Sequence, residues 1–94
     1  MTTNPFAESE FEIVNQLGLH ARAAAQLVKV ANRFKSEVTV TCEGQSANAK
    51  SIMGVLMLAA AKGMKLTVRC EGPDSAECLE EIRKLIADKF GEAQ

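Results

Sequence analysis

Tryptophan and tyrosine are absent from this 94-residue chain, and its only aromatic side chains are four phenylalanines. An RNA-recognition domain stacks bases on aromatic side chains of an exposed sheet face. Of the four phenylalanines, only Phe11 lies in a predicted strand. It is two residues from Ile13 and therefore points to the same, buried face. The chain also has no basic block, and its formal net charge is −1. Because nucleic-acid affinity depends largely on Lys and Arg that neutralise phosphates, we predict no nucleic-acid binding.

Cysteine is scarce, with Cys42, Cys70 and Cys78 widely spaced and no C-x-x-C pair. The odd number argues against a disulfide framework, and the spacing argues against a metal site. We therefore expect reduced thiols, a cytoplasmic location, no bound metal and no cofactor. Long apolar runs are also missing: the longest uncharged run, residues 51–61, is too short to span a bilayer. The first ten residues lack the basic start and apolar run of a signal peptide.

The hydrophobic periodicity predicts seven elements in the order β-α-β-β-α-β-α. The strands are predicted over 10–14, 37–42, 45–49 and 65–70, and the helices over 21–34, 51–63 and 74–91. Every strand alternates polar and apolar residues, which indicates an antiparallel sheet with one buried face. The predicted fold class is therefore α+β, a two-layer open-faced sandwich in which three helices cover one face of a four-stranded sheet. We expect residues 1–94 to form a single domain and a monomer, with residues 1–9 as a loose leader.

The single histidine, His20, lies where a glycine-containing loop meets the start of the first predicted helix. A helix N-terminus presents unpaired N–H groups and the positive end of the helix dipole, so it favours anions. An imidazole there acts as a nucleophile near neutral pH. Arg22, in the same turn, adds a permanent cation suited to phosphate oxygens. These local features are compatible with phosphoryl chemistry, but also with a polar surface histidine and a solvated arginine.

Two segments carry a resemblance to a known family. Residues 18–24, Gly-Leu-His-Ala-Arg-Ala-Ala, resemble the active-site segment of the HPr family, the histidine-containing phosphocarriers of the bacterial phosphotransferase system. Residues 50–56, Lys-Ser-Ile-Met-Gly-Val-Leu, resemble the second signature of that family. The order of elements is similar as well, from about residue 10 to residue 90.

The resemblance implies a role for each matching residue. His20 matches the histidine that carries phosphate on Nδ1, and Arg22 matches the arginine beside it. Ser51, which we predict as the N-cap of the second helix, matches a serine that a dedicated kinase phosphorylates in many members. The family accepts phosphate from Enzyme I and passes it to Enzyme IIA-type proteins. Enzyme I takes that phosphate from phosphoenolpyruvate.

The predicted partner surface lies next to Ser51. Met53 and Met57 are four residues apart and form either gap-filling core positions or an adaptable patch for partner proteins, and the resemblance favours the patch. Lys50 belongs either to a basic rim beside this patch or to the ordinary surface charge. Phosphate on Ser51 would add negative charge where an acidic partner docks, which would slow that docking.

One position departs from the family pattern. The family usually has proline after the arginine, and this chain has Ala23. Alanine favours a helix and adds one N–H near the phosphate position, so the departure bears on the transfer rate and the pathway. The alternatives are a regulatory protein-binding module of a nitrogen-type or carbon-regulation branch, and a small acyl-phosphate hydrolase. We predict the phosphocarrier, a phosphorylated intermediate rather than a stand-alone enzyme.

Overall fold

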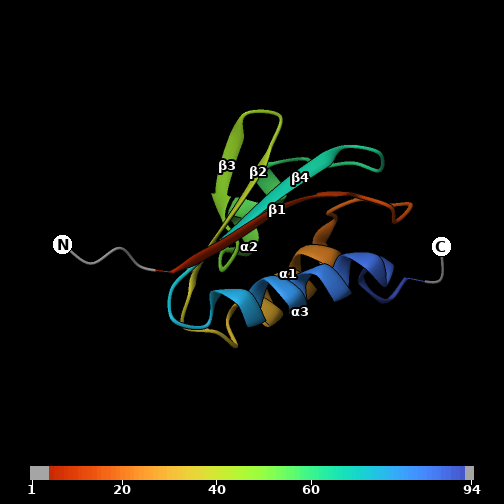
Figure 1. Cartoon of the computed structure of the whole chain (residues 1–94). Helices are drawn as coiled ribbons and strands as arrows, with labels where there is room; N and C mark the ends of the chain where they lie inside the picture. Colours follow the sequence, from red (N-terminus) through yellow and green to blue (C-terminus); the bar gives the residue numbers. More distant parts are fainter. Residues whose placement is uncertain (1–4, 93–94) are drawn as a thin grey trace.

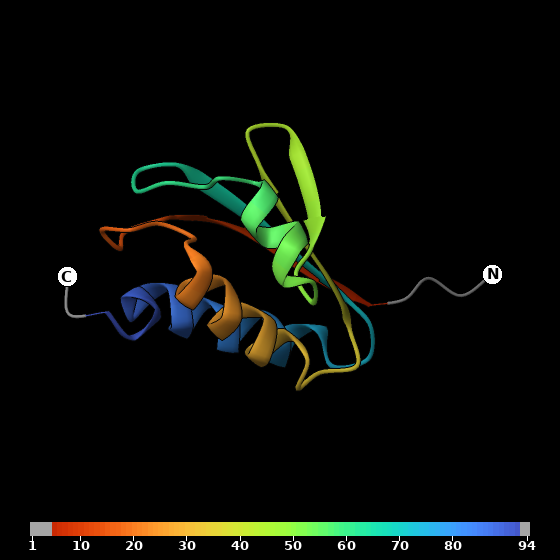
Figure 2. The same ribbon diagram turned by 180° about the vertical axis from the view of Figure 1, so that it is seen from behind.

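A computed structural model describes residues 5–92 and confirms the predicted order of elements (Figure 1). The elements are β1 (Phe6–Glu12), α1 (Ala21–Ala31), β2 (Glu37–Cys42), β3 (Gln45–Asn48), α2 (Ile52–Met57), β4 (Lys65–Glu71), α3 (Ser75–Ala87) and a short 3-10 turn, η1 (Lys89–Gly91). The four strands form one antiparallel sheet in the order β1-β4-β2-β3. Both views show the helices on one side of this sheet, so the predicted open-faced α+β sandwich is confirmed (Figures 1 and 2).

The first strand begins earlier than predicted. Residues 6–9 pair with β4 in continuous register, with Phe6 opposite Glu71 and Ser9 opposite Val68. The prediction of a loose leader is therefore wrong for residues 6–9, while residues 1–4 lie outside the described part of the chain. The sequence signal for this strand is weak because β1 lies at the edge of the sheet and its outer positions are polar. Backbone pairing with β4, rather than alternation of its side chains, determines where β1 begins.

The core forms where the alternating strands meet the helices. Val40 and Val68 are directly opposite in β2 and β4, and both are fully buried. Leu27 of α1 and Ile82 of α3 belong to the same hydrophobic cluster and are equally buried. All three cysteines are free thiols and lie buried in this core.

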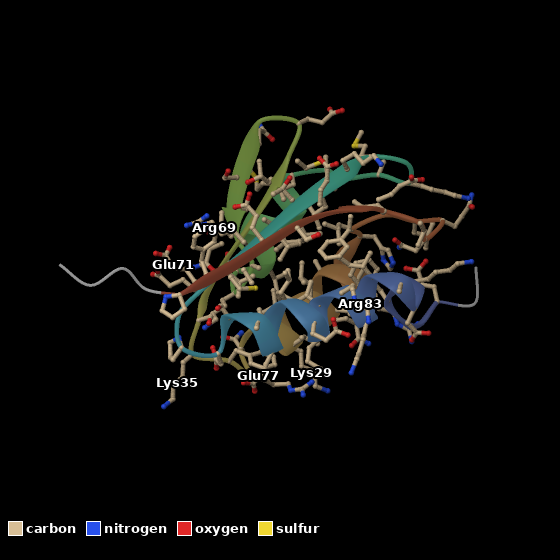
Figure 3. The ribbon with its side chains drawn as sticks, in the orientation of Figure 1. Lys29, Lys35, Arg69, Glu71, Glu77 and Arg83 are labelled. Atoms are coloured by element: carbon tan, nitrogen blue, oxygen red, sulfur yellow. The ribbon has the colours of Figure 1, made fainter. Side chains whose placement is uncertain are left out.

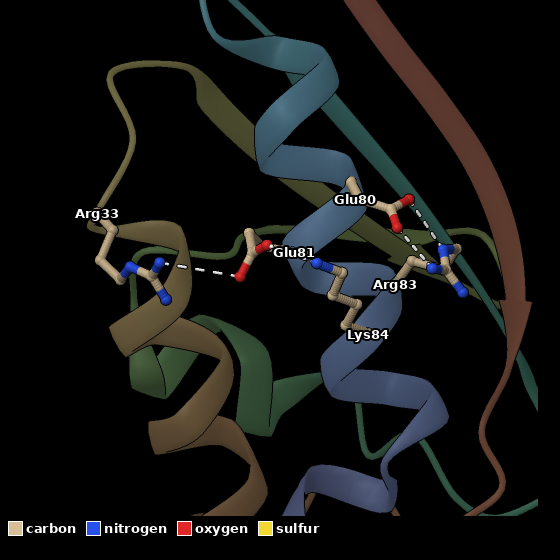
Figure 4. A network of polar contacts seen from close by, with 5 residues as sticks. All are labelled: Arg33, Glu80, Glu81, Arg83 and Lys84. Carbon is tan, nitrogen blue, oxygen red and sulfur yellow. Dashed lines mark hydrogen bonds and ion pairs between the residues drawn. The ribbon is translucent and has the colours of Figure 1, made fainter.

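The other face of the sheet is polar and charged. Arg69 and Glu71 of β4 lie close together (Figure 3). The guanidinium of Arg69 lies 3.9 Å from the centroid of the Phe6 ring and 3.1 Å from Glu8 Oε1. Exposed pairs also occur on the helical side, where Arg33, which follows α1, lies 3.8 Å from Glu81 of α3 (Figure 4). Such pairs each contribute only about 0–1 kcal/mol, so apolar packing holds the helices on the sheet.

All three helices are shorter than the periodicity predicts. Helix α1 ends at Ala31, and α2 ends at Met57 because Ala59 adopts a left-handed conformation with φ of 50°. Helix α3 ends at Ala87, and the next turn is left-handed over residues 89–91. A left-handed conformation costs an L-residue roughly 1–2 kcal/mol. This turn buries Phe90, which is 2% exposed, and returns the chain toward the start of α1.

Asp74 is the N-cap residue of α3, but its side chain makes no capping hydrogen bond. Its carboxylate instead accepts hydrogen bonds from the backbone N–H groups of Lys35, at 2.8 Å, and Ser36, at 2.9 Å. The hydroxyl of Ser36 donates to the same carboxylate. Asp74 therefore joins the α1–β2 loop to the start of α3. These hydrogen bonds lower the pKa of Asp74, and the one from the Ser36 hydroxyl has the largest effect.

We expect the Asp74 contacts to make the protein less stable in acid. The pKa of Asp74 is lower in the folded state than its usual value of 3.8, so the unfolded state binds its proton more readily. The stabilisation that the ionised Asp74 contributes is therefore fully present above pH 3.8, and it is lost as the pH falls through the folded-state pKa of Asp74. Urea unfolding from neutral to acidic pH should therefore show Asp74→Asn less stable than wild type at neutral pH, with a smaller difference in acid. Glu77→Gln, which changes an exposed carboxylate in the same helical turn, is the control. A difference that does not change with pH would contradict the assignment.

Candidate functional site

His20 is the N-cap residue of α1, as predicted. Its backbone is extended, with φ of −74° and ψ of 178°, and its carbonyl accepts the first intrahelical hydrogen bond, from Ala24 N–H, at 2.8 Å. Its side chain does not cap the helix, so the N–H groups of residues 21–23 are without a side-chain cap. The His20 side chain is 28% exposed. A partly accessible imidazole thus lies beside an uncapped helix N-terminus.

The loop before His20 is fixed to the segment that follows α2. Leu19 N–H donates to Ala60 O at 2.9 Å, and Gly18 approaches the same carbonyl so closely that a Cβ at residue 18 would lie 2.4 Å from it. Gly18 also has a φ of +63°, which glycine adopts at no steric cost. The glycine in the predicted motif therefore sets the position of His20 relative to α2.

A carboxylate from the end of the chain contacts the ring. Glu92 Oε2 lies 2.6 Å from His20 Nε2 and 2.9 Å from Asn15 Nδ2, and Asn15 Nδ2 also donates to Gly18 O at 2.8 Å. Hydrogen bonding to His20 is the largest cause that lowers the pKa of Glu92, and burial partly opposes it. Neither Glu92 nor Asn15 is among the site residues predicted from the sequence.

The other predicted site residues lie around this centre. Arg22 is in the first turn of α1 with an exposed side chain and, within residues 5–92, takes part in no ion pair. Ser51 caps α2, because Gly54 N–H donates to its Oγ at 3.1 Å, which confirms the predicted N-cap. Lys50 Nζ donates to Phe34 O at 2.9 Å, so its ammonium is held against the loop after α1.

Apolar side chains of α2 and of the loop before His20 are exposed. Met53 is 69% exposed and Met57 is 74% exposed, so they are not core residues. Leu17, in the loop fixed to the end of α2, is 66% exposed, and Ile52 is 43% exposed. Three of the four extend from α2, which packs against α1, and Leu17, Ile52, Met53 and Met57 are together called the apolar patch.

Two further properties concern the described residues alone. Across residues 5–92, histidine, cysteine and carboxylate side chains form no group of three that could ligate a metal ion. In that same part of the chain, no helix combines the length and apolar character needed to cross a membrane.

Comparison with known proteins identifies the family. The family model described as the PTS HPr component phosphorylation site matches residues 7–88. The chain belongs to the HPr family. Within that family it is 48% identical over 82 residues to the phosphocarrier protein HPr of Cupriavidus necator, with 87% of this chain and 92% of the relative covered. It is 46% identical over 87 residues to that of Neisseria meningitidis, with 93% and 98% covered.

Solved HPr structures share the whole architecture. An HPr structure from Thermoanaerobacter tengcongensis matches with a TM-score of 0.90 and 40% identity, covering 94% of this chain and 99% of that one. An HPr from Bacillus anthracis matches with a TM-score of 0.84 and 36% identity, covering 88% and 99%. As an HPr protein, the chain is a phosphocarrier of the phosphotransferase system, and the comparisons do not favour the alternative of a purely regulatory module.

Proposed function

We propose that His20 is the residue that carries the phosphoryl group. The observation that supports this most directly is the position of its ring at the uncapped N-terminus of α1. A phosphoryl group on the ring would have the amide groups of residues 21–23 and the positive end of the helix dipole nearby. Because Nε2 is engaged by Glu92, Nδ1 is the ring nitrogen available to phosphate, which agrees with the Nδ1 chemistry implied by the family.

Arg22 is proposed to pair with the phosphate oxygens. Its guanidinium is always charged, and its side chain is exposed in the same helical turn as the amide groups. Ala23 stands where the family usually has proline, and it is 1% exposed and helical, so α1 still begins at Ala21. The substitution leaves the helix start intact and adds a backbone donor near the phosphate.

The proposed donor is Enzyme I and the proposed acceptors are Enzyme IIA-type proteins. Mass spectrometry after incubation with phosphoenolpyruvate and Enzyme I tests this step. A carrier gains one acid-labile phosphate per chain, whereas an acyl-phosphate hydrolase gains none. The cell compartment proposed for this exchange is the cytoplasm, and the proposed active form is a monomer. Solved relatives include an HPr dimer from Thermoanaerobacter tengcongensis, so light scattering at the assay concentration must test the monomer.

The apolar patch is proposed as the surface on which these partners dock. Met53 and Met57 extend from α2 as flexible, polarisable side chains, and such side chains adapt to several partners in turn. Because α2 packs against α1, whose N-cap residue is His20, a protein seated on the patch would bring its own phosphoryl-carrying residue toward the ring. Lys50 lies at the start of the same helix but is hydrogen-bonded to Phe34 O, so we assign it a supporting position at the edge of the surface.

We expect Met57→Glu to weaken docking without unfolding the protein. Met57 is 74% exposed, so a carboxylate there stays hydrated in the free protein and becomes desolvated only when a partner covers it. Calorimetric titration with Enzyme I should show an affinity lower by about tenfold or more, since a residue at the centre of an interface contributes at least about 1–2 kcal/mol. Ala76→Glu places the same charge on an exposed position of α3 and should leave the affinity unchanged. Equal affinities for both variants would contradict the proposed surface.

Ser51 is proposed as a regulatory phosphorylation site. Its Oγ already accepts from Gly54 N–H, and a phosphate at this helix start would be near the same amide groups, so modification should not unfold α2. It would add negative charge at the edge of the apolar patch. In the same titration, Ser51→Asp should bind Enzyme I more weakly than Ser51→Ala does. If the two variants bind alike, charge at residue 51 does not regulate docking.

A further inference from the structure

Two methionine side chains of α2 extend into solvent. Met53 and Met57 are the two most exposed large apolar side chains among the described residues. They are four positions apart and therefore lie on the same face of α2. Figure 2 shows α2 in front of the sheet, with no other element of the described chain drawn over it. A small oxidant therefore reaches both side chains without any opening of the fold.

Met64 is held in a different environment. It directly precedes β4, is half-buried and packs against the hydrophobic core. Its sulfur accepts a hydrogen bond from Ala61 N–H at 3.3 Å and lies 3.9 Å from the Cys42 thiol. Because burial and these contacts restrict access to the sulfur, we expect Met64 to react with an oxidant more slowly than the two methionines of α2.

The three thiols do not compete for the oxidant. Peroxides react with the thiolate rather than with the protonated thiol. Cys42, Cys70 and Cys78 are all buried, and burial is the largest cause that raises the pKa of each thiol, for Cys70 to about 12. All three are therefore protonated at neutral pH. Within residues 5–92, the thioethers of α2 are thus the sulfur groups most accessible to peroxide.

We propose that Met53 and Met57 form a reversible oxidation site through which peroxide weakens docking on the apolar patch. The proposal rests on the proposed function of that patch. A sulfur lone pair attacks one oxygen of the peroxide, an S–O bond forms as the O–O bond breaks, and water leaves. The sulfur loses two electrons and the peroxide gains them. A methionine sulfoxide reductase reverses the change: two thiols supply the electrons, form a disulfide, and the oxygen leaves as water.

The sulfoxide changes the chemistry of the patch rather than the fold. Each sulfoxide oxygen accepts hydrogen bonds from water in the free protein, and a partner that covers the patch has to remove that water. Before oxidation, the same partner contacts an apolar thioether. Neither Met53 nor Met57 belongs to the hydrophobic core, so oxidation should leave the free energy of unfolding close to its original value.

Peptide mapping by mass spectrometry after brief treatment with hydrogen peroxide tests the site itself. Met53 and Met57 should each gain one oxygen before Met64 does, and the three cysteines should remain reduced. Urea denaturation of the treated protein shows whether the fold is retained. Oxidation of Met64 as fast as that of Met53 and Met57 would overturn the proposed selectivity.

Calorimetric titration with Enzyme I tests the effect on docking. Oxidised wild type should bind with an affinity lower by about tenfold or more, because both sulfoxide oxygens become desolvated. Treatment with methionine sulfoxide reductases and a thiol reductant should restore the affinity. Met64→Leu should lose affinity on peroxide treatment as wild type does. The double variant Met53→Leu/Met57→Leu has no thioether in the patch, so its affinity should be the same before and after peroxide, whatever its starting value.

The outcomes separate this proposal from the one on which it rests. If oxidised wild type binds as tightly as untreated protein, or if the double variant loses affinity as well, oxidation of these two methionines does not control docking. If Met57→Glu binds Enzyme I as tightly as Ala76→Glu does, the docking surface itself is wrong. Weak binding by Met57→Glu together with tight binding by the oxidised protein overturns the oxidation site alone.

Discussion

His20→Ala should abolish phosphate uptake from phosphoenolpyruvate and Enzyme I. The reason is chemical: the variant has no imidazole, so no ring nitrogen remains to form the N–P bond. Removing a nucleophile costs far more than removing a group that assists it, so the rate should fall by a factor of at least about 10³. The measurement is intact-protein mass spectrometry over time, with acid treatment to show that the phosphate gained by wild type is acid-labile.

A second variant separates chemistry from structure. His20→Gln keeps a side-chain N–H that is able to donate to Glu92, but it has no nucleophilic nitrogen. It should therefore fold like wild type and take up no phosphate. Ser51→Ala should take up phosphate at close to the wild-type rate, because Ser51 Oγ bonds to the α2 backbone rather than to the ring. Acid-labile phosphate on His20→Ala would show that another residue is the acceptor.

The parts of the site that sequence reasoning found depend on local chemistry. His20 and Arg22 were placed at a helix start because the apolar spacing of α1 begins at that point, and the structure has α1 beginning at Ala21. Ser51 was predicted as a cap from its position before an apolar stripe, and its Oγ accepts from Gly54 N–H. In each case, the residues that set the geometry lie within a few positions of one another. Periodicity and capping rules are informative over that range.

The parts that sequence reasoning missed depend on contacts between distant residues. Glu92 follows a left-handed turn, and no periodicity indicates that a chain will reverse there and reach a loop 72 residues earlier. Phe90 falls within the predicted third helix, 74–91, and is buried, but it reaches the core through that turn rather than through a continued helix. Asp74 stands at the predicted start of the third helix, and nothing local indicates that its carboxylate accepts hydrogen bonds from the distant Lys35 and Ser36. Tertiary hydrogen bonds decided these positions over local preference.

Gly18→Ala should destabilise the protein strongly and disturb the site at the same time. The new Cβ would lie 2.4 Å from Ala60 O and 2.9 Å from Ala61 Cα, and both atoms are backbone, so a rotamer change offers no relief. The residue would also have to keep a φ of +63° with a side chain. Together the left-handed conformation and the overlap should reduce the free energy of unfolding by about 2–4 kcal/mol, as measured by urea denaturation. Since His20 follows two residues later, phosphate uptake should slow as well.

Gly44→Ala provides the matched control, because Gly44 has a φ of +81° but no atom within 4 Å of the position that a Cβ would occupy. It should show the cost of the left-handed conformation alone, roughly 1–2 kcal/mol, and uptake at the wild-type rate. The additional loss in Gly18→Ala then measures the close approach between the loop before His20 and the segment after α2. If both variants lose the same stability, that approach does not hold the loop, and the position of His20 must depend on the hydrogen bonds of Leu19 and Asn15 instead.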